Sequence, residues 1–273
     1  QSVRVSELDP KNENLLIDDF KSLDTSRWHL VDGKWDHQPG ELKQLLDGPQ
    51  RSAARLLSSP PRDFDAVVKF TTLGGSKWRS VGMAFDVDPG NENTKSPTDQ
   101  HQHVYVSAVS GGSKVQAAYR KSGADHYPGD AMRGIPIELN KQYTLRVRVR
   151  GDLINVDLDG KTVVAWRTPL PRRDGALQLT TFDALAVFHE FSLQPLDPSY
   201  TLQEPKAGVA TPTTPAQTEG LVAIAKTKLR VAELTKSSAE SEVASLQNRI
   251  AAMRQKWRLE DLTHENPDTT SQQ

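Results

Sequence analysis

The chain has 273 residues, a formal net charge of −1 and no cysteine. This length suits one large domain or one domain with an appendage, and the balanced charge excludes a chain built around bulk positive charge for nucleic acid or anionic membrane. Without cysteine the chain forms no disulfide, thiolate zinc site or cysteine nucleophile. No apolar run approaches the roughly 20 residues of a membrane span, so the sequence predicts neither a nucleic-acid partner nor a membrane span.

Between residues 63 and 193 apolar and polar residues alternate, which is typical of half-buried β-strands. Leu145, Val147 and Val149 fall on one face of such a segment, and three arginines fall on the other. Asp159-Gly160 stands between two segments, as in a type I′ hairpin. We expect strands at 63–72, 78–88, 103–110, 114–120, 143–151, 153–159, 162–168, 175–183 and 184–193.

Many short strands with turns and no intervening helix predict an all-β, two-sheet antiparallel jelly-roll sandwich. We expect its strands over about residues 14–196, within a domain that covers residues 1–200. The apolar faces should meet in one core, which we expect to contain Phe20, Trp28, Phe70, Phe85, Val104, Val106, Leu145, Val147, Val149, Val156, Leu158, Phe188 and Phe191.

The pattern changes near residue 200. Residues 201–214 contain threonine and proline without an apolar period, which predicts a linker. We expect a helix over 215–263, in which apolar residues from Val222 to Trp257 follow at spacings of three and four, with the polar Lys236 in this seam. Residues 264–273 are expected to be a disordered tail. This pattern predicts a long coiled-coil helix that packs on a helix of a second copy or of a missing parent domain. The alternative is that the helix folds back on the sandwich.

The sequence offers little evidence for catalysis. Polysaccharide hydrolases need two carboxylates about 5 Å apart, or further apart for inversion. Residues 1–202 contain six glutamates, and none lies in a cluster with two-residue spacing. Nucleophile-elbow and zinc-protease motifs are also missing from the sequence. The nearest candidates for a carboxylate pair are Asp86, Asp88, Asp99 and Asp125.

Two stretches could bind a metal. Asp86, Asp88, Asn91 and Asn93 supply several oxygens from one tight turn, as calcium requires, although the same residue types also form ordinary hairpin loops. His101 and His103 lie two residues apart and should share a strand face with Tyr105, so they could hold a transition metal or form a polar outward face.

A third set of residues suggests a carbohydrate-binding surface. Proteins grip sugars with aromatic faces and polar groups on a sheet face or its loops. If the predicted strands are neighbours, such a surface arises; otherwise Trp78 and Tyr105 belong to the core or its rim. The candidate ligand-binding residues are Trp78, Arg79, His103, Tyr105, Arg120, His126 and Tyr127.

The sequence from Asp18-Asp19-Phe20 and Ser26-Arg27-Trp28 through residues 153–191 resembles a concanavalin A-like (laminin G-like) jelly roll. The run from Val156 to Arg167, the turn from Pro171 to Leu177 and the following heptad helix resemble a region of large planctomycete-specific proteins that contain a cytochrome c-like module. The haem motif C-x-x-C-H is absent here, so the resemblance places haem elsewhere. A neighbouring family hydrolyses 3-keto-glycosides, but its active residues cannot be placed on this sequence.

The resemblance implies an exported protein, periplasmic or on the cell surface, that deals with carbohydrate. We therefore expect a non-catalytic carbohydrate-binding or adhesion module of a larger exported protein, with a polysaccharide or glycan as its partner. The alternatives are a glycoside-active hydrolase of a concanavalin-like family and a purely structural spacer. Calcium is the one cofactor that the sequence suggests.

Overall fold

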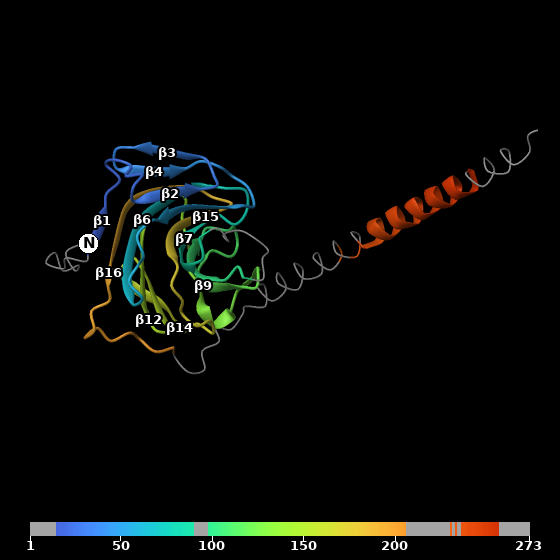
Figure 1. The fold of residues 1–273 in the computed structure, drawn as a ribbon. Coiled ribbons are helices and arrows are strands. Elements are labelled where there is room, and N and C mark those ends of the chain that lie inside the picture. Colours follow the sequence, from blue (N-terminus) through green and yellow to red (C-terminus); the bar gives the residue numbers. More distant parts are fainter. Residues whose placement is uncertain (1–14, 90–97, 206–229, 231–232, 234–235, 257–273) are drawn as a thin grey trace, which may run out of the picture. The chain divides into compact units, whose positions relative to one another are not determined.

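The computed structural model describes residues 15–89, 98–205, 230, 233 and 236–256. The chain divides into two compact units, Gln1–Pro212 and Thr213–Gln273. The described part of the first unit is a sandwich of two eight-stranded sheets, drawn in blue to orange in Figure 1. All strand pairs in both sheets are antiparallel, and the two-sheet jelly-roll prediction is confirmed.

Both sheets combine strands from distant parts of the chain. Sheet A has the order β14 (Lys161–Arg167), β13 (Leu153–Leu158), β12 (Gln142–Arg150), β6 (Phe64–Gly74), β16 (Leu185–Pro195), β4 (Glu41–Gln44) and β3 (Trp35–Gln38), with β1 (Leu16–Asp18) beside β16. Sheet B has the order β10 (Ala124–His126), β9 (Lys114–Lys121), β8 (His101–Ser107), β7 (Ser80–Val87), β15 (Ala176–Phe182), β5 (Arg51–Leu56) and β2 (Trp28–Val31), with β11 (Met132–Gly134) beside β9. One short 3₁₀ turn, Gly129–Ala131, precedes β11.

The core lies between the sheets and follows the predicted alternation. Leu145, Val147 and Val149 of β12 are fully buried, and all thirteen residues expected in the core belong to one buried apolar cluster. The hairpin prediction is also confirmed, because Asp159 and Gly160 have φ values of +49° and +78°. The nine predicted strands are present, and none begins or ends more than three residues from its expected position.

The outer face of sheet A carries an ionic network instead of apolar side chains. Arg146 donates to both carboxylate oxygens of Asp65 at 2.8 and 2.6 Å, and Arg148 donates to Asp157 at 2.9 Å. This network is largely buried because the segment after β16 packs over it, and the Arg148 guanidinium lies 4.7 Å from the ring centroid of Tyr200.

The sandwich continues past the boundary expected at residue 200. Leu202 is only 7% exposed and clusters with Leu153 and Leu196. The backbone N–H of Gln203 donates to the Asn155 side chain, and Arg167 pairs with Glu204. The first residues of the predicted linker 201–214 therefore pack on sheet A, and residues 206–214 lie outside the described residues.

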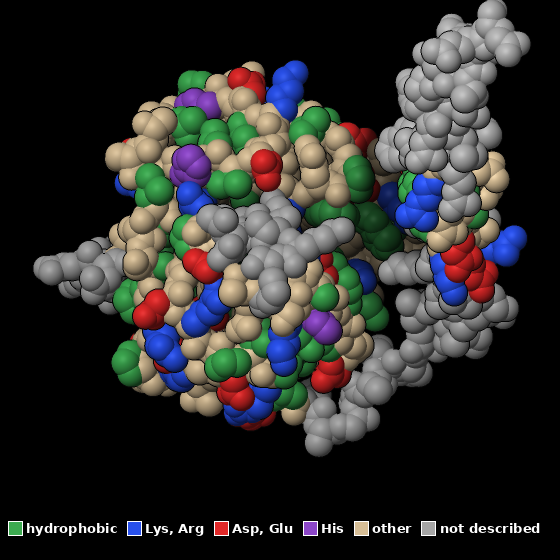
Figure 2. Space-filling model, turned by 45° about the vertical axis from the view of Figure 1, so that its right-hand side comes forward, with side chains coloured by type: hydrophobic (Ala, Val, Ile, Leu, Met, Phe, Trp, Pro, Cys, Tyr) green, Lys and Arg blue, Asp and Glu red, His purple; other side chains and the backbone are tan. Residues whose placement is uncertain are grey.

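The described part of the second unit is a helix over residues 236–256, about 31 Å long at 1.5 Å per residue. The remaining residues of the predicted helix 215–263, apart from 230 and 233, lie outside the described part of the chain, as does the predicted tail 264–273. No helix in the described residues has the length and apolar character to cross a membrane. Figure 2 shows acidic and basic side chains interspersed over the visible surface, in keeping with the net charge of −1.

Candidate functional site

Sheet B presents an unusual group of polar and aromatic residues on the face that points away from the core. On β8, Val104 and Val106 point inward, so His101, His103 and Tyr105 point outward by alternation. We call this group the His–Tyr face: it comprises Arg51, Asp99, His101, His103, Tyr105, Gln116, Arg120, Asp125 and Tyr127.

Small residues of β7 leave room for the large side chains of β8. Gly82 pairs with Tyr105, and Ala84 pairs with His103. A Cβ atom on Gly82 would lie 2.0 Å from the carbonyl oxygen of Val104 and 2.6 Å from the Cα of Tyr105. Any larger residue at this position would therefore push β8 away and shift the Tyr105 side chain.

The charged residues of the face form one alternating chain. Arg120 donates through Nε to Asp99 at 2.5 Å and through Nη1 to Asp125 at 2.9 Å, so one guanidinium bridges two carboxylates. The second guanidinium, that of Arg51, lies 3.6 Å from Asp125 and donates to Nε2 of His101 at 2.6 Å. These contacts cross several strands and fix the orientation of both arginines.

The contact with Arg51 fixes the protonation state of His101. A guanidinium only donates, so Nε2 of His101 accepts and the ring proton lies on Nδ1, 3.4 Å from Asp99. Burial, followed by the positive charge of Arg51, lowers the pKa of His101 to about 2. His101 is therefore neutral, and its contact with Asp99 is not an ion pair at physiological pH.

His103 is neutral for similar reasons. It is 6% exposed, and burial together with the charges of Arg51 and Arg120 holds its pKa well below the ordinary value. Its ring packs near the rings of Tyr105 at 5.7 Å and Tyr127 at 6.1 Å between centroids. The Tyr105 hydroxyl donates to Gln116, whose amide in turn donates to the carbonyl of Pro128, which holds the loop that carries Tyr127.

Three buried polar atoms of the face make no hydrogen bond in the described structure: Nε2 of His103, Nδ1 of His101 and Oδ1 of Asp125. Buried polar atoms normally find partners, because leaving one without a partner costs about 1–3 kcal/mol. Beside them the Tyr127 ring is 55% exposed and lies perpendicular to the Tyr105 ring. The face thus combines an exposed aromatic ring with the Nε2 atom of His103, which makes no hydrogen bond, and with two polar atoms whose charged or polar neighbours lie beyond hydrogen-bonding distance.

The structure brings together four of the seven residues predicted to bind a ligand: His103, Tyr105, Arg120 and Tyr127. His126 lies on the opposite side of β10, where its ring stacks on Tyr119 at 4.7 Å and 7°.

Trp78 and Arg79 lie in the loop before β7, near the end of β8 that is remote from His101. The Ser107 hydroxyl donates to the carbonyl of Trp78, and the backbone N–H of Trp78 donates to the Asp183 carboxylate. Arg79 donates through Nε to the carbonyl of Gly75. These two residues therefore do not join the charged part of the face, although the same sheet carries them.

The calcium prediction remains open to experiment. The Asp86 carboxylate accepts hydrogen bonds from Arg172 at 2.7 Å and Gln102 at 3.1 Å, and Asp88 lies 3.8 Å from Arg173. Asn91 and Asn93 lie outside the described residues. A calcium ion would therefore compete with two arginines for the carboxylates, which a titration followed by thermal unfolding would reveal.

The two histidines do share a face, with ring centroids 5.7 Å apart. Arg51 already occupies the Nε2 lone pair of His101 that a metal would need. Across the described segments, no group of three or more His, Asp or Glu side chains has a metal-binding arrangement.

Sequence reasoning did not assign Arg51 or Gln116 to the site, and it named Asp99 and Asp125 only as possible catalytic carboxylates. Arg51 begins β5, whose sequence RSAARL lacks clean alternation. In addition, β15 and β7 separate β5 from β8 in the sheet. No local signal connects these residues, so only the strand order could have identified them.

No known family model matches the sequence, and no curated protein is significantly similar to it. Solved structures with the same fold are numerous. A carbohydrate-binding module of type CBM66 from Bacillus subtilis is similar with a TM-score of 0.52 and 23% identity, over 61% of this chain and 94% of that one.

A Bacillus licheniformis beta-glucanase has a TM-score of 0.51 and 13% identity, over 67% of this chain and 99% of that one. A Bacillus subtilis protein of unknown function with a galectin-like fold has a TM-score of 0.51 and 11% identity, over 66% and 94% of the two chains. At these identities the likeness shows the shared jelly-roll fold.

Proposed function

We propose that this chain is a non-catalytic carbohydrate-binding or adhesion module, which binds a polysaccharide or glycan through the His–Tyr face of sheet B. One observation carries the proposal: buried polar atoms that make no hydrogen bond, Nε2 of His103 among them, lie beside the half-exposed ring of Tyr127. Sugars present apolar ring faces and hydroxyl groups, and this combination matches both.

Each part of the face has a role in such binding. A sugar ring stacks on Tyr127, where the exposed aromatic area is largest. Oδ1 of Asp125 and Nε2 of His103 are buried, so the neighbouring Tyr127 side chain has to turn to admit a ligand. Sugar hydroxyls then donate to Oδ1 of Asp125 and to Nε2 of His103, provided that this nitrogen carries no proton. The Arg51 and Arg120 guanidinium groups are held by the two aspartates before any ligand arrives, so little side-chain entropy is lost on binding.

The comparison with solved structures supports this proposal. A solved carbohydrate-binding module shares the fold over nearly its whole length. We also infer that the module belongs to a larger exported protein, in the periplasm or on the cell surface, as the resemblance of the sequence implies. The C-terminal helix would then connect it to a helix partner.

A glycoside-active hydrolase is the second candidate, because Arg120 bridges two carboxylates on the same face, and because a beta-glucanase shares the fold. A hydrolase needs one carboxyl group that can donate a proton. Asp99 and Asp125 instead accept hydrogen bonds from a guanidinium, and Asp99 is buried. This arrangement suits binding better than proton transfer. Release of reducing sugar from a polysaccharide panel would favour the hydrolase.

The test is binding of the whole chain to a panel of soluble polysaccharides by affinity electrophoresis, followed by calorimetry with oligosaccharides. Tyr127→Ala and His103→Ala should each weaken binding by up to about tenfold, since an aromatic contact and a hydrogen bond each contribute about 0.5–1.5 kcal/mol.

The matched control is Tyr200→Ala, which removes another partly exposed tyrosine, on the outer side of sheet A. It should leave binding unchanged. Lack of binding to the whole panel, or equal losses for Tyr127→Ala and Tyr200→Ala, would overturn the proposal. Equal affinity of Trp78→Ala and the wild type would place Trp78 outside the binding surface.

A further inference from the structure

The C-terminal helix carries an apolar seam that the described residues leave in solvent. Val243, Leu246, Ile250 and Met253 follow at spacings of three, four and three residues, and each is between 47% and 53% exposed. A monomer helix gains little stability from such a seam, because helix stability in proteins comes mainly from packing. The spacing fits positions a and d of a heptad, which face a partner helix.

The charges beside this seam have an uneven order along the helix. In the heptad set by Val243 at position a, the flanking positions e and g hold Glu233, Glu240 and Glu242 in the first half. The same positions hold Arg249, Arg254 and Lys256 in the second half. A helix that is acidic at one end of its seam and basic at the other is complementary to a reversed copy of itself.

We propose that two copies of this chain associate through antiparallel pairing of their C-terminal helices. The best register sets Val243 opposite Leu246 of the second copy and Ala239 opposite Ile250, so that small and large side chains share each layer. Lys236 then lies opposite Met253 at the edge of the described seam, where its ammonium group can reach solvent.

This register makes the flanking charges complementary. Positions g pair with g in an antiparallel coil, which sets Glu242 opposite Arg249 of the second copy. Positions e pair with e, which sets Glu233 opposite Arg254. Each pair occurs twice by symmetry, and among the described residues no like charges face each other.

The parallel arrangement lacks this complementarity. There a residue at g faces the residue at e five positions later, so Arg249 of each copy faces Arg254 of the other. Glu242 faces the neutral Gln247. The described residues therefore favour the antiparallel dimer.

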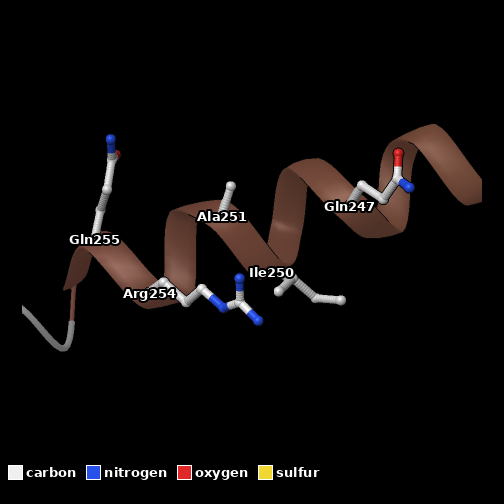
Figure 3. A pocket seen from close by; sticks show the side chains of 5 residues that line it. All are labelled: Gln247, Ile250, Ala251, Arg254 and Gln255. Atoms are coloured by element: carbon white, nitrogen blue, oxygen red, sulfur yellow. The ribbon is translucent and has the colours of Figure 1, made fainter.

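Figure 3 shows Ile250 and Arg254 projecting from one side of the helix, and Ala251 and Gln255 from the other. Arg254 thus lies beside the seam, as a residue that pairs across the interface must.

A dimer also carries two sandwiches, so a polysaccharide with repeated sites would be held more tightly than by one copy.

The first experiment measures the mass of the whole chain by light scattering and sedimentation over a concentration series. We expect a dimer of twice 30.2 kDa. Arg249→Glu should weaken an antiparallel dimer at least about tenfold, because two attractive pairs become repulsive, whereas it would strengthen a parallel one. Glu242→Lys combined with Arg249→Glu should restore the dimer. Asn248→Glu adds a nearby charge at the outer position f and serves as the control.

The second experiment uses the absence of cysteine from the chain, which gives no disulfide background. Ala239→Cys and Ile250→Cys chains, mixed and oxidised, should form a mixed disulfide, since the two positions face each other. Ile250→Cys alone should not, because its two copies would lie about 16 Å apart along the helix axis, beyond disulfide reach. A strict monomer, a disulfide in Ile250→Cys alone, or a dimer strengthened by Arg249→Glu would overturn the proposal.

Discussion

The buried histidine His101 should make the folded protein less stable as the pH falls from 7.5 to 5.5. Burial and the guanidinium of Arg51 lower its pKa to about 2, against about 6.5 in an unfolded chain. Between these two values the unfolded state binds a proton that the folded state does not. The free energy of unfolding therefore rises with pH through this window, and the contribution of His101 to it is complete above the window.

The size of the effect follows from the linkage relation. For His101 the free energy of unfolding should fall by about 1.4 kcal/mol between pH 7.5 and 5.5. His103 should lower the free energy of unfolding further over the same pH range. Its pKa is also held well below the ordinary value by burial and by the charges of Arg51 and Arg120.

Urea unfolding at the two pH values provides the assay. His101→Gln keeps an acceptor for Arg51 but removes the proton-binding group, so its loss between pH 7.5 and 5.5 should be about 1.4 kcal/mol smaller than that of the wild type. Tyr105→Phe, on the same face, binds no proton in this range and should show the wild-type loss. An equal loss in His101→Gln and the wild type would show that His101 does not resist protonation in the folded state.

Two further substitutions test the packing beside the face. Gly82→Ala should lower the free energy of unfolding by about 3 kcal/mol or more, because the added Cβ would meet the backbone of β8. Gly134→Ala is the control and should cost little, because no atom lies within 4 Å of its Cβ. Thermal unfolding compares the two variants. Arg172→Met should lower the free energy of unfolding by about 3–5 kcal/mol, because it leaves the buried Asp86 without its guanidinium partner. Adding Asp86→Asn to the same chain should recover much of that loss, as measured by urea unfolding. A merely additive double variant would show that the two residues do not interact.

The sequence by itself determined the sandwich and its core. Leu145, Val147 and Val149 alternate with arginines, and this period of two specifies which side chains point inward without reference to any other strand. The Asp159-Gly160 turn was equally local, because its left-handed backbone suits those two residue types. The strands β1 to β5 were not predicted, since they are short or, like RSAARL, lack a clear period.

Only the tertiary structure decided how the site is assembled. Tyr105 and Arg120 could be predicted to lie on adjacent strands, because β8 and β9 follow each other in sequence. Arg51 joins them from β5, about fifty residues earlier, through a strand order that no local pattern encodes. His126 was predicted to join the face but lies on the other side of the strand. Side chains alternate along β10, so His126 stacks on Tyr119 while its neighbour Asp125 points to Arg120. Side-chain periodicity is a local property, whereas the meeting of distant strands depends on the packing of the whole sheet.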